Sequence, residues 1–241
     1  GGRCLEIAPS GERALPGILY LFGGGFVMGG PLEDLAISAK LAAWTGRRVV
    51  SPAYRLAPEH PAPAAFEDAR AAHSQLLARG WAPEQIVLGG DSAGGGLALA
   101  LLGEQCRTGI RPCAVFAFSP WVDLTLSGDS LTENAARDPF LPPARIKEVR
   151  DLVLGDLAPD DPRVSPLFVS FDSPPPVQIH VGTTEILRDD SRRMAAHLRA
   201  AGGTVELNEW TNAPHIWPIF DGYIPEARET IGSVARFLDQ N

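Results

Sequence analysis

Cysteine is scarce in this chain of 241 residues, and long apolar runs are missing. The cysteines are odd in number and lack the spacing of zinc ligands, so we expect buried or incidental thiols at Cys4, Cys106 and Cys113. No apolar run is long enough to cross a bilayer, and no signal peptide opens the sequence. We therefore expect no stable membrane insertion and, by default, a cytoplasmic protein.

Positive charge is also in short supply. Lysine and arginine number 21 against 29 aspartates and glutamates, which gives a formal net charge of −8 at pH 7. That balance argues against nucleic acid and against an anionic membrane surface as partners. No P-loop lysine accompanies the glycine-rich stretch at residues 23–25, which argues against phosphate binding there.

Apolar residues, by contrast, make up 45% of the chain and recur in a regular order. Short apolar runs predict strands at residues 4–7, 18–22, 48–51, 86–88, 114–118, 177–181 and 205–210, the first and last at sheet edges. Helical patterns occupy residues 36–44, 66–79, 92–102, 145–154, 191–201 and 227–238. Their alternation predicts a mostly parallel α/β sheet with helices on both faces and the strands' carboxyl ends at one edge.

Residues 124–171 interrupt this alternation. The segment is rich in aspartate and proline and carries one expected helix, at residues 145–154. We interpret it as a cap-like excursion from a single domain that spans residues 1–241, rather than as a separate domain. No internal repeat accompanies it.

A nucleophile elbow is predicted at Gly90-Asp91-Ser92-Ala93-Gly94, between a buried strand and an apolar helix. The sequence fits the G-x-S-x-G pattern, in which a sharp strand-to-helix turn lifts the serine hydroxyl toward a substrate. Flanking glycines keep side chains out of the crowded turn. The alternative interpretation is a glycine-rich turn in which Ser92 only caps the helix.

A serine nucleophile needs a base, and His215 is the best candidate. In α/β hydrolases the chain order is serine, acid, histidine. Of the five histidines, His215 alone follows a predicted strand and lies in a loop beyond Ser92. The alternative is a loop histidine that caps residues 216–218.

Three carboxylates compete for the acid position after the strand at residues 177–181. Asp189 and Asp190 adjoin the next predicted helix, where a cap or a first-turn charge explains them. Glu185 lies nearer the strand end and has no such local explanation, so we favour Glu185.

An oxyanion hole requires backbone N–H groups that a substrate can approach closely. Gly24 and Gly25 follow the strand at residues 18–22, and Ala93 follows the serine. We expect these three residues to supply the donors, because their side chains are small or absent.

Together these residues resemble the hormone-sensitive-lipase-like esterases, the bacterial family IV carboxylesterases of the α/β-hydrolase fold. The resemblance covers about residues 19–238, and five stretches carry it: residues 20–26, 54–61, 90–95, 161–167 and 185–190. It implies an α/β-hydrolase fold, a catalytic acid at Glu185, a base at His215, and an oxyanion hole at Gly24, Gly25 and Ala93.

Two features depart from the family pattern, one residue and the length of the N-terminal segment. Phe22 stands where the family usually has the histidine of a His-Gly-Gly-Gly loop. Either the loop is then poorly ordered and the enzyme slow, or the neighbours have adapted to the ring. About twenty residues precede this loop, too few for the family's N-terminal helical cap, so a reduced cap is expected.

These observations predict a carboxylesterase that hydrolyses short to medium acyl esters through a Ser92, His215 and Glu185 triad and an acyl-enzyme. The expected partner is a small-molecule ester, and no metal or organic cofactor is implied. The alternative is a catalytically weak or inactive ligand-binding homologue. The exposed edge predicted at residues 205–210 suggests a homodimer.

Overall fold

The computed structural model describes residues 3–9 and 17–241, in which seven strands form one sheet. In spatial order the strands are β1 (Cys4–Ile7), β3 (Val49–Pro52), β2 (Gly17–Leu21), β4 (Ile86–Asp91), β5 (Ala114–Phe118), β6 (Val177–Gly182) and β7 (Val205–Trp210). β1 pairs antiparallel with β3, and all other neighbours are parallel. The predicted α/β fold and its two edge strands are confirmed.

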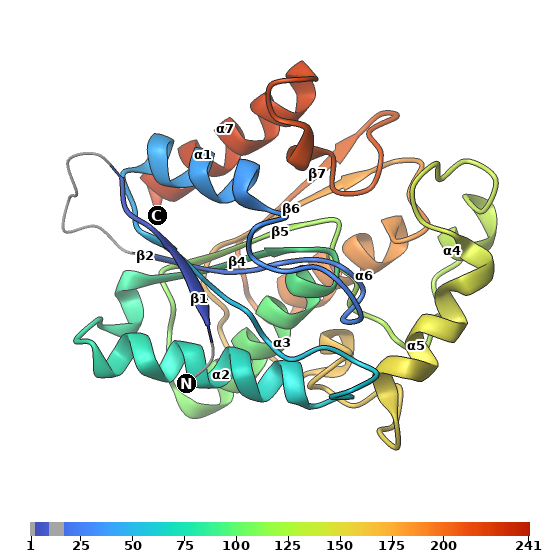
Figure 1. Ribbon diagram of the computed structural model, residues 1–241, viewed down its shortest axis with the longest axis horizontal. Coiled ribbons are helices and arrows are strands. Elements are labelled where there is room, and N and C mark those ends of the chain that lie inside the picture. The colour runs from blue at the N-terminus through green and yellow to red at the C-terminus, as the bar shows by residue number, and fades with distance from the viewer. Residues whose placement is uncertain (1–2, 10–16) are drawn as a thin grey trace.

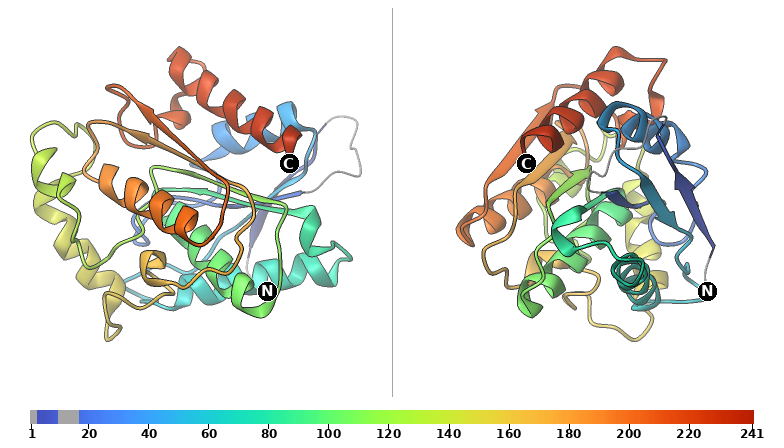
Figure 2. Two further views of the ribbon diagram at one scale, coloured as in Figure 1. Left: turned by 180° about the vertical axis from the view of Figure 1, so that it is seen from behind. Right: turned by 90° about the vertical axis from the view of Figure 1, so that its left-hand side faces the viewer.

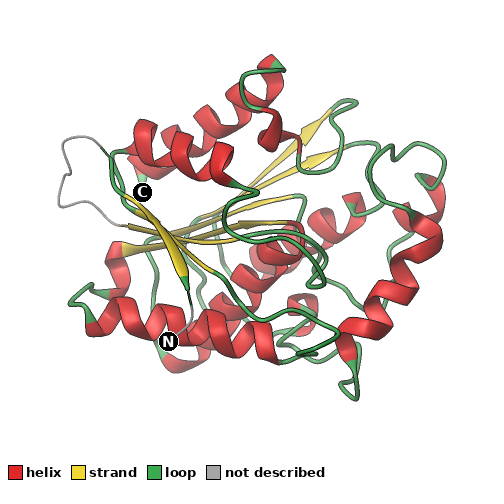
Figure 3. Cartoon of the chain, in the orientation of Figure 1, coloured by secondary structure: helices red, strands yellow, loops and turns green. Residues whose placement is uncertain are grey.

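Helices cover both faces of the sheet (Figure 1 and Figure 3). One face carries α1 (Leu35–Thr45) and α7 (Pro225–Gln240); the other carries α2 (Ala64–Ala78), α3 (Ser92–Thr108) and α6 (Arg188–Ala200). In β2, Ile18 and Tyr20 pack in the core under α1 and α7, whereas Leu19 and Leu21 pack in the core under the other three helices. This alternation is the period of two that a strand buried on both faces requires.

The parallel strands end together at one side of the molecule. Figure 2 shows the twist of the sheet from two further directions. Residues at the carboxyl ends are paired in register: Leu21 with Gly90, and Asp91 with Phe118. The loops that follow β2, β4, β5, β6 and β7 therefore converge at this side.

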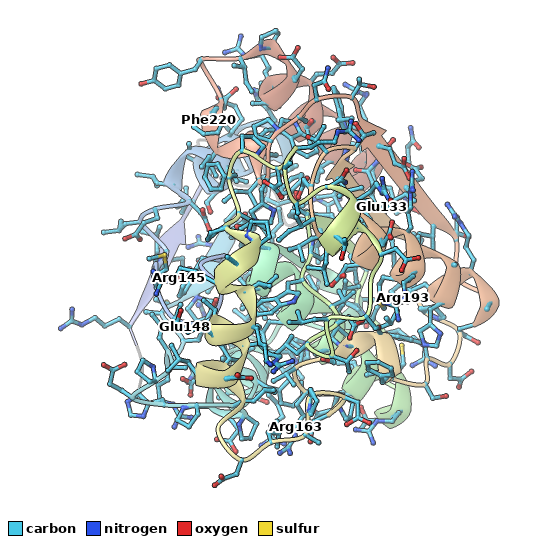
Figure 4. The ribbon with its side chains drawn as sticks, turned by 90° about the vertical axis from the view of Figure 1, so that its right-hand side faces the viewer. Glu133, Arg145, Glu148, Arg163, Arg193 and Phe220 are labelled. Atoms are coloured by element: carbon cyan, nitrogen blue, oxygen red, sulfur yellow. The ribbon has the colours of Figure 1, made fainter. Side chains whose placement is uncertain are left out.

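The excursion at residues 124–171 lies beside these strand ends. Figure 4 shows the molecule with the excursion facing the viewer. It contains α4 (Ser130–Glu133) and α5 (Ile146–Leu154). The sequence predicts α5 but misses α4, which is too short for an apolar period to develop. Arg145 and Glu148 form an exposed ion pair at 3.1 Å on this face. That the excursion serves as a cap stays a prediction.

Asp34 occupies the N-cap position of α1, but its side chain makes no capping hydrogen bond. The helix expected at residues 191–201 begins at Arg188, so Asp189 and Asp190 lie inside its first turn.

Among the described helices, none has both the length and the apolar character needed to cross a bilayer.

Asp190 joins the start of α6 to the loop after β5. It is 2% exposed, and its Oδ2 accepts hydrogen bonds from the backbone N–H groups of Val122, at 2.9 Å, and Asp123, at 3.1 Å. Burial raises the pKa of this carboxyl to about 8, and the nearby charge of Asp123 adds to the rise, against the lowering effect of the two N–H groups.

The raised pKa of Asp190 predicts a pH-dependent stability. The folded protein holds this proton between about pH 4 and pH 8 and the unfolded chain does not, so the free energy of unfolding should fall as pH rises toward 8. Asp190→Asn removes the proton and should remove this slope, which approaches about 1.4 kcal/mol per pH unit for one proton. Denaturant unfolding of both proteins from pH 5.5 to pH 8 measures it. Parallel curves would contradict the prediction.

Candidate active site

Ser92 lies on the sharp turn between β4 and α3. Its backbone has φ of +50°, in the left-handed region that non-glycine residues rarely adopt. Such strain persists only where the surroundings enforce it, and it is typical of functional positions. Gly94 is part of that enforcement, because a Cβ there would lie 2.1 Å from the carbonyl oxygen of Leu21. The turn leaves Ser92 6% exposed.

Three side chains from distant parts of the chain form one hydrogen-bonded series. His215 Nε2 lies 2.9 Å from Ser92 Oγ, and His215 Nδ1 lies 2.7 Å from Glu185 Oε2. His215 is 2% exposed and Glu185 is fully buried. The structure therefore brings together the three residues that the sequence selects for the triad.

The second carboxylate oxygen of Glu185 is also held. Glu185 Oε1 accepts a hydrogen bond from the Ser119 hydroxyl at 2.8 Å and one from the Gly182 N–H. Ser119 follows β5, has φ of +48°, and accepts a hydrogen bond from the Ile216 N–H at 3.3 Å. One hydroxyl thus links the loop of Glu185 to the loop of His215. Sequence reasoning missed this role, although the position of Ser119 directly after a strand is a usable signal.

The competing carboxylates are engaged elsewhere. Asp189 accepts a hydrogen bond from the Ser130 N–H at 2.9 Å and pairs with Arg188 at 3.0 Å, while Asp190 serves the loop after β5. Asn134 and Asp138 of the excursion hold the backbone around Glu185. The Asn134 amide donates to the Glu185 carbonyl at 2.8 Å, and Asp138 Oδ2 accepts from the Ile186 N–H at 2.8 Å.

Three of the other histidines are buried or half-buried in strands and helices. His180 is fully buried in β6, where burial lowers its pKa to about 3 and the Trp210 indole donates to its Nδ1 at 3.1 Å. His73 is 4% exposed on α2. His197 on α6 is half-buried, with its Nε2 2.6 Å from the Val169 carbonyl oxygen.

The glycine loop after β2 lies directly against the elbow. A Cβ on Gly23 would come within 3.2 Å of the Ser92 Cβ. Gly24 has φ of +114°, and its carbonyl accepts hydrogen bonds from the N–H groups of Val27 and Met28, both at 3.1 Å. Ala93 lies in the first turn of α3, where N–H groups have no partner within the helix. The glycine loop and the first turn of α3 therefore both lie beside Ser92.

Two side chains flank this arrangement. A Cβ on Gly25 would lie 3.4 Å from a Val149 methyl group, so α5 passes close to the glycine loop. The ring of Phe140 lies 6.1 Å from that of His215. Both residues come from the excursion, which therefore borders the site.

Phe22 is packed rather than loose. Its ring is 1% exposed and stacks on Tyr54, with centroids 4.0 Å apart and planes 8° from parallel. The Tyr54 hydroxyl donates to the Phe22 carbonyl at 2.7 Å. Tyr54 therefore holds the start of the glycine loop by both its ring and its hydroxyl, which supports the view that the neighbours have adapted to phenylalanine.

The chain is similar to known proteins over nearly its whole length. A family model described as alpha/beta hydrolase fold matches residues 18–219. An acetyl-hydrolase of Streptomyces hygroscopicus is 37% identical over 222 residues, 92% of this chain and 74% of that protein. A carboxylesterase/phospholipase, LipF of Mycobacterium tuberculosis, is 34% identical over 238 residues, 95% of this chain and 64% of that protein.

A solved structure is similar in its fold as well. The crystal structure of an esterase from the bacterial hormone-sensitive lipase family superposes with a TM-score of 0.94 at 38% identity. The match covers 98% of this chain and 80% of that one. The chain thus spans between about two thirds and four fifths of these relatives.

The packing of Phe22 generates a prediction for Phe22→His. The imidazole would bring a polar group into a buried stack on Tyr54, so we expect a loss of about 1–3 kcal/mol in unfolding free energy and no gain in turnover. Melting temperature and the turnover of p-nitrophenyl butyrate measure the two effects. A several-fold rise in turnover with an unchanged melting temperature would mean that the phenylalanine loop is poorly ordered.

Proposed function

The chain belongs to the α/β-hydrolase family, within its hormone-sensitive-lipase-like esterases, and on that premise we propose that this carboxylesterase hydrolyses short to medium acyl esters through Ser92, His215 and Glu185. The single observation that carries the proposal is the hydrogen-bonded series from the Ser92 hydroxyl through His215 to Glu185. Each member lies within the reach that proton transfer and orientation of the base require.

The proposed reaction begins when Ser92 Oγ attacks the ester carbonyl while His215 Nε2 takes its proton. The carbonyl oxygen becomes an oxyanion, and the imidazolium is stabilised by ionised Glu185. His215 then returns the proton to the leaving alcohol, which departs and leaves an acyl group on Ser92. Water, activated by His215, attacks the acyl-enzyme, and the acid leaves with the serine restored.

Backbone N–H groups of Gly24, Gly25 and Ala93 are proposed to hold the oxyanion in both tetrahedral states. Donors fixed beforehand stabilise developing charge without reorganising at the moment of reaction. The tight turn at Gly24 and the helix start at Ala93 support this assignment. All three proposed oxyanion donors are therefore backbone N–H groups of this chain.

Two observations support esterase chemistry over a ligand-binding role. A binding module has no need of a strained serine turn, yet Ser92 has φ of +50°. It also has no need of a buried carboxylate held on both oxygens against a histidine, as Glu185 is.

The preference for short acyl chains has narrower support. Val149 lies near Gly25, and Phe140 lies near His215, so bulky side chains stand close to both sides of the proposed reaction centre. One relative is named an acetyl-hydrolase.

β7 forms an edge of the sheet as expected, and a homodimer through it stays a prediction.

Substitution of the proposed triad tests the mechanism. Ser92→Ala should lower turnover of p-nitrophenyl acetate by at least about 10³-fold, because the attacking oxygen is lost. Glu185→Gln should lower turnover by about 10³-fold or more, since a neutral amide cannot stabilise the imidazolium. Asp190→Asn is the matched control for a buried carboxyl and should stay within about twofold. Equal rates for wild type and Ser92→Ala, or a larger loss in Asp190→Asn than in Glu185→Gln, would contradict the assignment.

A chain-length series tests the substrate class. We expect kcat/KM to be highest between p-nitrophenyl acetate and hexanoate, and to fall at least about tenfold for the laurate. Val149→Ala and Phe140→Ala should each shift the maximum toward longer chains if these side chains limit the acyl site. Ala196→Ser, on the exposed side of α6, is the control and should leave the profile unchanged. A profile that stays flat or rises to the laurate would rule out a short-chain preference.

A further inference from the structure

Two carboxyl groups meet behind the glycine loop. Asp91 ends β4 immediately before Ser92 and is fully buried. Asp34 lies at the start of α1 and is 5% exposed, and its side chain makes no capping hydrogen bond to the helix. The two carboxyls lie close enough for each to shift the pKa of the other, and both lie against Gly23. Neither takes part in the triad chemistry described above.

The remaining contacts of the pair lead to the glycine loop and to β2. The Tyr20 hydroxyl donates to Asp91 Oδ1 at 2.9 Å. The Gly23 N–H lies against both carboxyls and donates to Asp34 Oδ2 at 3.3 Å. Asp91 Oδ2 is buried, and no N–H or O–H donor among the described residues meets it with good geometry. A Cβ on Gly23 would lie 2.1 Å from that oxygen, so the loop backbone sits directly on the pair.

This arrangement calls for one proton between the two carboxyls. Carboxylates that touch in a buried place cannot both be ionised, and one retained proton becomes a hydrogen bond between them. That hydrogen bond supplies the partner that Asp91 Oδ2 otherwise lacks. A fully hydrogen-bonded buried network holds its members in one arrangement, whereas an unpaired buried oxygen is costly.

We propose that Asp34 and Asp91 are positioning residues, and that the hydrogen bond between their carboxyls ties the glycine loop to the nucleophile elbow. The proposal rests on the proposed function, because it concerns the oxyanion donors of that reaction. Gly24 and Gly25 follow Gly23 on one side of the pair, and Ser92 and Ala93 follow Asp91 on the other. The pair thus sets the distance between the donors on the loop and the nucleophile on the elbow.

The electrostatics of the site agree with a retained proton. Burial is the main cause that raises the pKa of both carboxyls, and the charge of Asp34 adds to the rise at Asp91, whose pKa lies well above its usual range. The titratable groups facing the pair are Glu33 beside Asp34 and the hydroxyls of Tyr20 and Tyr54, whose own pKa values are raised. Both shifts favour the protonated form of one carboxyl, and its proton is lost as pH rises through the raised pKa.

The kinetic test separates positioning from mere stability. Asp34→Ala should lower kcat by about tenfold, part of the 10²–10³-fold that a missing oxyanion donor costs, with KM within about twofold. Affinity for a trifluoromethyl ketone, whose adduct on serine carries an oxyanion, should fall in parallel with kcat/KM. Asp91→Asn keeps an acceptor for Tyr20 and a donor for Asp34, so it should retain kcat at pH 7 to within about twofold. Unlike the wild type, it should show no alkaline fall in kcat from loss of the shared proton.

Asp190→Asn is the matched control, since it alters a buried carboxyl that does not touch the glycine loop. A kcat for Asp34→Ala equal to that of wild type would overturn the positioning role. So would a loss of kcat without a loss of ketone affinity. An Asp91→Asn variant with the same alkaline limb as wild type would overturn the shared proton.

Infrared difference spectroscopy tests the pair without relying on activity. Because Asp190 also holds a proton at pH 7, the spectra are compared in the Asp190→Asn background. There the parent protein should show the C=O stretching band of a buried protonated carboxyl, which the added Asp91→Asn change should remove and the added Ser92→Ala change should keep. If Asp34→Ala does not fold, the comparison of this parent with and without Asp91→Asn still decides the matter. Absence of the band in the Asp190→Asn parent, or its persistence after Asp91→Asn is added, overturns the proposal. Failure of the proposed function would instead appear as activity retained in Ser92→Ala, with the band unaffected.

Discussion

The parallel pairing of β4, β5, β6 and β7 is the constraint on which the site depends. Backbone hydrogen bonds hold these strands in register, so that Asp91, Phe118 and His180 lie side by side across three of them. Ser92 and Ser119 leave the sheet one residue beyond two of these positions. Because parallel strands end at the same side, residues separated by 123 positions, Ser92 and His215, meet at 2.9 Å. Loss of this register would move every proposed catalytic group at once.

Local sequence patterns were sufficient to predict the sheet and the three central side chains. A strand buried on both faces is a continuous apolar run, as in β5, and its end is readable from the glycine or polar residue that follows. The elbow has a pattern of its own, and chain order leaves few candidates for the acid and the base. Glu185 could be separated from Asp189 because a carboxylate in a helix's first turn already has a local reason to be there.

Contacts between distant segments could not be predicted in the same way. The position of Ser119 after a strand places it at this side of the sheet, but its contacts with Glu185 and the Ile216 N–H join segments that are distant in the sequence. Asp34 has the sequence position of an N-cap, yet its carboxyl turns to Asp91, 57 residues away, because a second buried carboxyl is there to share a proton. For Phe22 the sequence left two alternatives, a poorly ordered loop or neighbours adapted to the ring, and the stack on Tyr54 supports the second.

We propose Ser92 as the single covalent centre of this carboxylesterase, activated by His215 and held beside preformed oxyanion donors. Its most direct test is the mass of the intact protein after reaction with an organophosphate ester such as diethyl p-nitrophenyl phosphate. The reagent transfers its phosphoryl group to an activated serine and releases nitrophenol. The account predicts one adduct per chain, located on the peptide that contains Ser92, in parallel with loss of esterase activity. An unlabelled chain, or an adduct on any other residue, would contradict it.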